Sequence, residues 1–280
     1  APQNRNKVRE WKIKEAFELL INRNWVKHEI PRVVKWKGVH KEYIEFKICV
    51  LEYPSGVKEY EYVKLPIKPF LRFLGWFISE GNARYNKHNG TYWVTIWNNN
   101  EEYLREIAKT IEELSYNPTI DYKRKCVIVS SIKLYEIIKA LGLPVHPEVK
   151  GRKSHLKFVP DFIKELSPEL IKEFLIALWK GDGTFYKTKD GKLIPLKYST
   201  TSKKLAEDVA ELCLKCGYAV SINVDDCAKR LNKRQHPLYN VIVSVRYTNP
   251  SMRNKPEVID YEGIVWCVKV PNGAVIVERN

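Results

Sequence analysis

The chain has 280 residues, which is long enough for two domains or for one domain with an internal duplication. Hydrophobic residues make up 44% of it, enough for a folded core and too many for wholesale disorder. No apolar run reaches the roughly 18 residues that a membrane-spanning helix needs, and the first residues lack the apolar stretch of a signal peptide. We therefore expect a cytoplasmic protein with no membrane partner.

The charge balance favours a polyanionic partner. Lysine and arginine number 48 against 33 aspartates and glutamates, a net charge of +15. A surplus of this size is typical of nucleic-acid binding, although a lysine-rich surface selected for solubility or heat stability is the alternative. A single methionine among many lysines and glutamates is compatible with a thermophilic, archaeal-like source.

Six cysteines are scattered along the chain, and only Cys213 and Cys216 have the spacing of metal ligands. Both fall in an expected amphipathic helix, on the face that carries Leu205 and Val209. This pattern favours thiols packed in the core over a zinc site.

The first half of the chain reads as a helix, a β-rich stretch and then a mixed segment. Residues 6–22 have a helical pattern, and 33–64 reads as strands joined by a turn at Pro54-Ser55-Gly56. An apolar helix then ends at Glu80. The asparagine run 98–100 suits the N-cap of the next helix. The elements expected after Glu80 are a strand at 91–97, a helix at 101–115, strands at 118–123 and 125–130, and a helix at 131–141.

The second half repeats this order. A second apolar helix begins at Ser167-Pro168, with proline at the first helical position, and ends at Asp182. A strand near 196–200, a helix at 203–216 and strands near 218–224 and 240–247 follow. Glu80 and Asp182 are 102 positions apart (182 − 80), and the same offset pairs Ile107 with Val209, Ala108 with Ala210, Tyr116 with Tyr218, and Ile120 with Ile222. A longer hairpin around 225–238 breaks the register. The sequence predicts an α+β fold made of tandem αββαββ repeats over 67–260.

Each apolar helix carries small residues four positions apart just before its acid: Gly75 and Ser79, then Ala177 and Gly181. Positions four apart share a helix face, so the two helices can pack closely and bring both acids to one end. That end bears partial negative charge, so a cation is needed there, and oxygen ligands suit Mg²⁺. A plain apolar helix with a glycine C-cap is the alternative for one copy. Two copies at the repeat spacing favour a metal site.

The segments LGWFISEG and LIALWKGDG resemble the paired LAGLIDADG (DOD-type) motifs of homing endonucleases, and the resemblance covers roughly residues 70–260. It implies that each repeat lays a saddle-shaped antiparallel sheet of four strands along the major groove of double-stranded DNA. It also implies a monomer acting as a pseudo-dimer, which hydrolyses both strands of a long asymmetric site. Glu80 and Asp182 would hold Mg²⁺, or Mn²⁺ in its place, with the carbonyls of Ser79 and Gly181 as further ligands.

The chain departs from the family pattern at Ile78 and Lys180, which stand where an earlier acid is common. We expect Lys180 to alter the charge near the site. A catalytically inactive nucleic-acid-binding module on the same fold, maturase-like or regulator-like, is the alternative function. A structural remnant of a splicing host is a third.

The family also places a lysine near each active centre. In intein-encoded members one lies in a K-x-I/V-P stretch before the second motif, and LKFVP supplies Lys157 here. Lys255, in NKPEV, is the symmetry-related candidate, while Lys153 and Lys133 are rivals in the first half.

The last segment, GIVWCVKVPNGAVIVERN, resembles the part of an intein that follows its endonuclease. An ordinary hairpin turning at Asn272-Gly273 is the alternative. We expect no splicing, because the chain does not begin with Cys or Ser, lacks T-x-x-H and does not end in His-Asn. The expected domains are a flanking segment at 1–66 that grips DNA or is a splicing-domain remnant, the repeats at 67–166 and 167–260, and an intein-like β segment at 261–280.

Basic residues interleaved with aromatics mark the expected DNA contacts. On a sheet that faces the groove, alternate strand residues reach bases and residues at the loop tips reach phosphates. Solvated hairpin tips are the alternative. The candidates are Lys123, Arg124, Lys125, Lys229, Arg230, Lys233, Arg234 and Arg246.

Overall fold

The computed structural model describes residues 36–53, 55–146, 154–187, 191, 193–225, 236–244, 260 and 262. The helix expected over 6–22, the intein-like segment and most of the hairpin around 225–238 lie outside these residues. The chain divides into two compact units, residues 33–246 and residues 1–32 with 247–280. Every element below belongs to the first unit. Among its described helices, none has the length and apolarity needed to cross a membrane.

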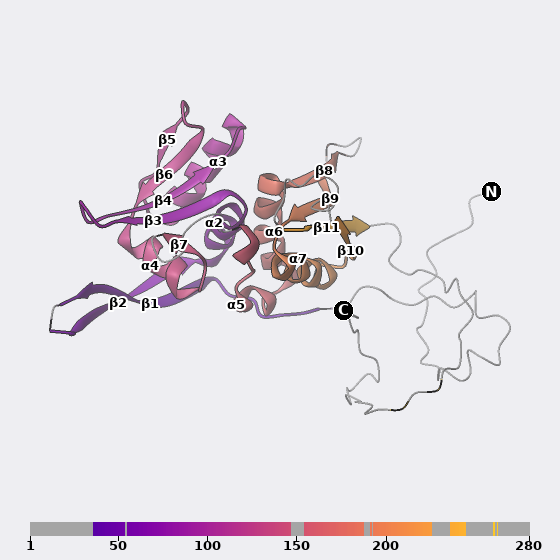
Figure 1. The fold of residues 1–280 in the computed structure, drawn as a ribbon, viewed down its shortest axis with the longest axis horizontal. Coiled ribbons are helices and arrows are strands. Elements are labelled where there is room, and N and C mark those ends of the chain that lie inside the picture. The colour runs from indigo at the N-terminus through magenta and orange to yellow at the C-terminus, as the bar shows by residue number, and fades with distance from the viewer. Residues whose placement is uncertain are drawn as a thin grey trace. The chain divides into compact units, whose positions relative to one another are not determined.

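The αββαββ order occurs twice, as predicted (Figure 1). The first repeat comprises α2 (Ile67–Glu80), β3 (Gly81–Asn86), β4 (Thr91–Trp97), α3 (Glu101–Glu112), β5 (Thr119–Asp121) and β6 (Cys126–Ser130). The second comprises α6 (Pro168–Asp182), β8 (Gly183–Lys187), β9 (Leu193–Thr200), α7 (Lys203–Lys215), β10 (Ala219–Asp225) and β11 (Leu238–Ser244). The strands β3 and β8 lie directly after the two acids, and the sequence pattern did not predict either of them individually.

The two sheets share one topology, which confirms the duplication. The strand orders are β5-β6-β4-β3 and β10-β11-β9-β8, all antiparallel. Gly81 pairs with Ile96 in the first sheet. Gly183 pairs with Tyr198 in the second sheet, and each of these two residues lies 102 positions after its counterpart in the first pair. The register of the second sheet then shifts after Thr184. The first sheet also gains a fifth strand, β7 (Val145–His146), which runs parallel to β3.

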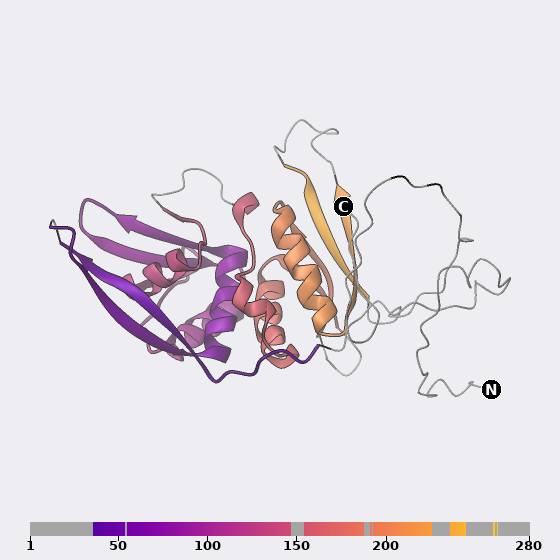
Figure 2. The same ribbon diagram turned by 90° about the horizontal axis from the view of Figure 1, so that it is seen from below.

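Helices α2 and α6 lie side by side and join the repeats (Figures 1 and 2). A Cβ atom on Gly75 would lie 2.5 Å from the carbonyl oxygen of Phe174, and one on Gly181 would lie 2.1 Å from Ser79 Oγ. The small residues therefore let the two backbones approach, as the sequence predicts. Large side chains such as Trp76 and Trp179 fill the surrounding core and are fully buried.

The elements outside the repeats pack onto them. The ribbon of β1 (Tyr43–Glu52) and β2 (Lys58–Pro66) leads into α2, and Phe46 meets Phe70 with ring centroids 5.2 Å apart. Trp36 Nε1 donates to the carbonyl of Leu166 at 2.8 Å, so the described N-terminal segment also contacts the chain just before α6. The remaining elements are α4 (Ile132–Ala140), η2 (Ser154–Leu156) and α5 (Asp161–Lys164).

The helix starts expected at Asn100 and at Ser167-Pro168 are both found, but only Asn100 makes a capping bond with its side chain. Asn100 caps α3, since its side chain accepts from the amide of Glu102 at 2.8 Å. Ser167 stands at the N-cap of α6 but makes no capping bond with its side chain; its hydroxyl lies 3.5 Å from His40 Nδ1 instead. Cys213 is buried and Cys216 is half-buried on α7, which agrees with core thiols.

Replacing Gly75 with alanine should lower the free energy of unfolding by about 1–2 kcal/mol. Overpacking against backbone typically costs about 1–3 kcal/mol, and the better helix propensity of alanine offsets up to about 1 kcal/mol of that. Gly75→Val should cost more. Urea denaturation measures the change, with Lys172→Ala on the exposed surface of α6 as the control; an unchanged midpoint for Gly75→Val would contradict the close contact.

Candidate functional site

The two acids are the last residues of the paired helices, and the glycines after them turn the chain into a strand. Gly81 and Gly183 both have extended backbone, with φ of −90° and −104°, so neither forms the left-handed cap of an ordinary helix end. A Cβ atom on Gly81 would lie 2.5 Å from the carbonyl of Phe77, and one on Gly183 would lie 2.3 Å from the ring of Trp179. Glycine is needed because each strand folds back against its own helix.

The carboxyl groups of Glu80 and Asp182 meet at this end. Crowding by protein atoms, and then the neighbouring Glu80 carboxylate, raise the pKa of Asp182 to about 7, although Lys157 acts in the opposite direction. A hydrogen bond with Glu80 contributes to the rise. The Asp182 side chain is open to solvent in spite of the crowding, so water screens part of this repulsion. The pair is a site of concentrated negative charge that a cation would stabilise.

Among the described lysines, Lys157 is the one that its contacts hold beside the two acids. Its ammonium group donates a hydrogen bond to the carbonyl of Ser79, next to Glu80. Burial lowers the pKa of Lys157, while Asp182 and Glu80 raise it in part compensation. The side chain comes from the segment between η2 and α5, so the link between the repeats delivers it.

The oxygen ligands that the protein offers here suit a hard divalent cation, but they fill only part of its coordination shell. Within the described residues, no group of three or more His, Cys, Asp or Glu side chains is placed so that it could hold a metal ion. Two carboxylates would leave most positions to carbonyls, water and phosphate, as Mg²⁺ prefers. The Ser79 carbonyl, predicted as a ligand, accepts from Lys157 in the structure. Gly181 borders the same end, against Ser79.

Lys180 adds less charge to the site than its position suggests. Its Nζ lies 2.7 and 2.6 Å from the two carboxylate oxygens of Glu106 on α3, and 5.5 Å from the ring centroid of Tyr103. Lys180 therefore links α6 of the second repeat to α3 of the first, and its charge is largely neutralised there.

A hollow beside Glu80 contains part of the predicted DNA surface. The exposed residues Arg124 and Lys125, in the β5–β6 turn, line it together with Glu80 and Gly181. Lys123 is exposed in the same turn. The structure therefore puts basic side chains next to one acid of the pair. The other DNA candidates, Lys229, Arg230, Lys233, Arg234 and Arg246, lie outside the described residues.

The rival lysines are separated from the acid pair or not described. Lys133 Nζ forms an ion pair with Glu61 on β2, at 2.5 Å. Lys153 and Lys255 lie outside the described residues, so the role of Lys255 stays a prediction.

Sequence reasoning missed three buried residues near the site. Tyr198 is 1% exposed, and burial, followed by Asp182 and Glu80, raises its pKa well above the ordinary value. Ser202 and Asp208, each 1% exposed, contact the segment that carries Lys157. One signal was available: the 102-residue offset pairs Asp208 with Glu106, an acid at the same helical position in both repeats.

Comparison with known families identifies the second half of the chain. Residues 169–249, from the start of α6 to beyond β11, match the model of the LAGLIDADG-like domain. Residues 169–249 are therefore similar to the LAGLIDADG-like domain. The match covers the helix that ends at Asp182 and the sheet that follows it, in the half where the motif reads LIALWKGDG.

Related sequences occur inside larger proteins. The chain is 30% identical over 185 residues to the DNA polymerase II large subunit of Thermococcus kodakarensis, an alignment that covers 63% of this chain and 9% of that protein. It is 29% identical over 147 residues to the ribonucleoside-diphosphate reductase subunit beta of Aquifex aeolicus, covering 51% and 19%. The chain thus spans less than a fifth of either relative.

Solved structures with a similar arrangement include two homing endonucleases. I-DmoI in complex with DNA and Ca is 19% identical, with 65% of this chain and 85% of that chain covered and a TM-score of 0.45. I-LtrWI bound to target DNA is 16% identical, with 64% and 80% covered and a TM-score of 0.34.

Removing the acid-pair repulsion should change how stability depends on pH. An acid whose pKa is higher in the folded chain than in the unfolded chain binds more protons when folded, so it lowers stability as the pH rises between the two values. For Asp182 that window runs from the ordinary 3.8 to about 7. Relative to wild type, Asp182→Asn should therefore gain stability across this window and keep a constant advantage above it.

Urea unfolding at intervals from pH 4 to pH 8 measures this difference. The control is Glu112→Gln, which removes an exposed carboxylate from α3. Parallel stability curves for wild type and Asp182→Asn would show that the pair is not electrostatically strained.

Proposed function

We propose that the protein is a homing endonuclease, an enzyme that hydrolyses both strands of double-stranded DNA at a long asymmetric site with a divalent cation. One observation carries the proposal: Glu80, Asp182 and Lys157 meet where the two repeats join, and a sheet extends from each acid. Two similar sheets in one chain suit a monomer that acts as a pseudo-dimer on DNA. The surplus of positive charge supports DNA as the partner.

Each group at the site has a task in this reaction. Glu80 and Asp182 would hold Mg²⁺, or Mn²⁺ in its place, and a bound cation would supply a Lewis acid for the scissile phosphates. Lys157 places an ammonium group beside the acids, where it would face negative charge that develops on phosphate. Arg124 and Lys125 line the hollow next to Glu80 and would hold the DNA backbone there.

An intein origin is part of the proposal. The relatives that share this stretch have unrelated names, among them DNA polymerases, a reductase subunit, a replicative helicase and a gyrase subunit. A segment that recurs inside such different proteins is best explained as an inserted element. The intein-like end of the chain, GIVWCVKVPNGAVIVERN, supports the same reading. The site of action would then be the DNA of the cell, with the protein in the cytoplasm.

Glu80→Gln and Asp182→Asn should each abolish cleavage of at least one DNA strand, because each removes one of the two carboxylates that would hold the cation. DNA affinity should stay within a few-fold, because neither acid attracts the DNA backbone. The substrate is found first by incubating the wild type with a randomised duplex library and Mg²⁺, and sequencing the cut ends. Single-turnover cleavage of the selected site then measures each variant.

Glu169→Gln is the matched control, since it neutralises a carboxylate at the opposite end of α6, where Glu169 pairs with Lys68 at 2.5 Å. Full cleavage by either acid variant would overturn the assigned roles. Enrichment of bound DNA without cut ends, in Mg²⁺ and Mn²⁺ alike, would support the inactive binding module in place of the endonuclease.

Binding of the cation is testable without DNA. Mg²⁺ at millimolar concentration should raise the melting temperature of the wild type, because a ligand that binds only the folded state stabilises it. The increase should disappear in the Glu80→Gln and Asp182→Asn variants and persist in Glu169→Gln. A differential scanning fluorimetry titration measures it, and equal increases in all four proteins would place the cation elsewhere.

A further inference from the structure

The segment that carries Lys157 has no secondary structure of its own to hold it. Residues 157–160 form neither helix nor strand, between η2 and α5. Val159 and Pro160 are buried, so the Val159 amide needs an acceptor from elsewhere in the protein. The position of Lys157 therefore depends on whatever fastens this segment.

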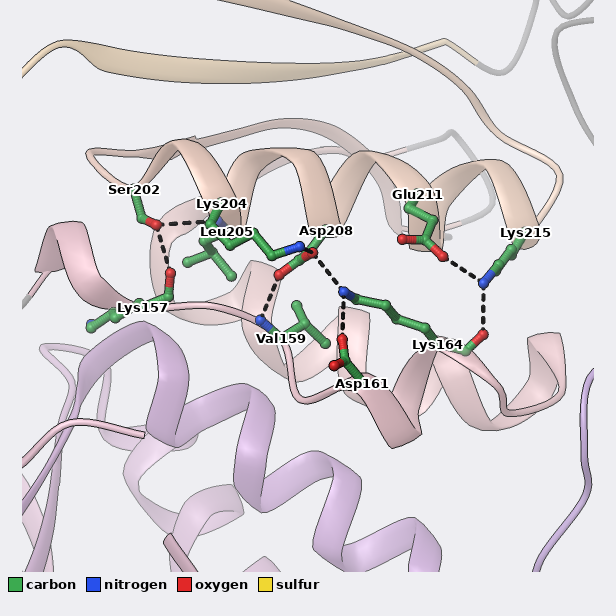
Figure 3. A network of polar contacts seen from close by, with 10 residues as sticks. All are labelled: Lys157, Val159, Asp161, Lys164, Ser202, Lys204, Leu205, Asp208, Glu211 and Lys215. Atoms are coloured by element: carbon green, nitrogen blue, oxygen red, sulfur yellow. Dashed lines mark hydrogen bonds and ion pairs between the residues drawn. The ribbon is translucent and has the colours of Figure 1, made fainter. Parts of the chain in front are cut away.

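Helix α7 supplies the fastening (Figure 3). Ser202 Oγ donates to the carbonyl of Lys157 at 2.6 Å, and Oδ2 of Asp208 accepts from the Val159 amide at 2.9 Å. Further along the same helix, Lys215 Nζ donates to the carbonyl of Lys164 at 2.8 Å. Residues 157–164 thus run along α7 with polar contacts at both ends.

Asp208 is the centre of this network. Its Oδ1 atom lies 2.8 Å from Nζ of Lys164 and 2.8 Å from Nζ of Lys204, while Oδ2 accepts the Val159 amide. The residue is 1% exposed, so its negative charge must be compensated by these groups. Burial alone would lower the pKa of Lys164, but its bonds to Asp161 and Asp208 raise it instead. Lys164 is therefore charged and holds the carboxylate in place.

The other repeat uses the same helical position differently. Glu106, which the 102-residue offset pairs with Asp208, binds Lys180 at 2.6 Å. Asn100, the counterpart of Ser202, caps α3 through the amide of Glu102. In the second repeat, Ser202 and Asp208 bind the segment at 157–160 in addition to groups of their own helix.

We propose that Ser202 and Asp208 are positioning residues, which hold the backbone at Lys157 and Val159 so that the Lys157 ammonium reaches the Ser79 carbonyl beside the acid pair. The catalytic consequence rests on the endonuclease function proposed above. The placement of Lys157 does not, and it can be measured separately.

The first measurement is the rate at which a lysine-acylating reagent modifies Lys157, read by mass spectrometry and normalised to the exposed Lys109. In the wild type, the bond to Ser79 and partial burial protect the ammonium group. Ser202→Ala and Asp208→Ala should increase the normalised rate several-fold, because each removes one of the two side chains that bind the backbone of residues 157–160. Ser202→Thr keeps the hydroxyl group and should restore the wild-type rate.

Two controls separate positioning from general loss of stability. Ser131→Ala removes the equivalent capping hydroxyl from α4, where Ser131 accepts from the Leu134 amide, and touches no part of the segment. Lys204→Ala removes an ion pair with Asp208 and leaves the bond to Val159 in place. Both should label at the wild-type rate. Unchanged labelling in Ser202→Ala and Asp208→Ala would overturn the proposal.

The second measurement is single-turnover cleavage of the selected duplex. Ser202→Ala should lose about tenfold in the cleavage rate, as is typical when an orienting partner of a catalytic group is removed, with DNA affinity within twofold. Lys157→Met should lose at least as much, and Ser202→Ala should add nothing further in that background. If the wild type cuts no duplex, the endonuclease proposal fails, while the labelling result still decides whether α7 positions Lys157.

Discussion

The close contact between α2 and α6 is the constraint on which the rest of the protein depends. Gly75 meets the backbone of Phe174, and Gly181 meets Ser79, so neither position has room for a Cβ atom. Because the helices are in contact over these small residues, their C-terminal ends coincide and the two acids meet. Larger residues at the crossing would separate the acids and the two sheets together.

The two ends of this helix pair have opposite electrostatic character. At the N-terminal end, Lys68 pairs with Glu169, and Arg72 Nη1 lies 2.9 Å from Glu173 Oε2, so charges of opposite sign face each other across the contact. At the C-terminal end, two acids face each other where the helix dipoles are already negative. The protein concentrates unfavourable charge at one end only. Such strain is expected where a cation or a polyanion with its cations binds.

Internal duplication provides the framework, and the departures from symmetry provide the site. The strand order and the first register pairs of the two sheets repeat at a constant offset. The acids at equivalent positions of α3 and α7 do not repeat in function, since Glu106 neutralises Lys180 and Asp208 anchors the segment of Lys157. The segment that carries Lys157 lies between the two repeats and occurs once. In the first repeat β2 runs directly into α2, so Lys157 has no counterpart at the same place there.

The sequence by itself determined the duplication, the paired acids and the strip of small residues, because these are periodic or local patterns. Helix faces repeat every three to four residues, and the duplication repeats at a single offset, so both can be read along the chain. Only the tertiary structure decided that Lys157 reaches Ser79, that Lys180 is neutralised by Glu106, and that Ser202 and Asp208 hold the linking segment. These contacts join residues 45 to 78 positions apart, and side-chain bonds over such distances follow no sequence period. They exist because folding places an irregular segment with unpaired backbone groups beside a helix that can satisfy them.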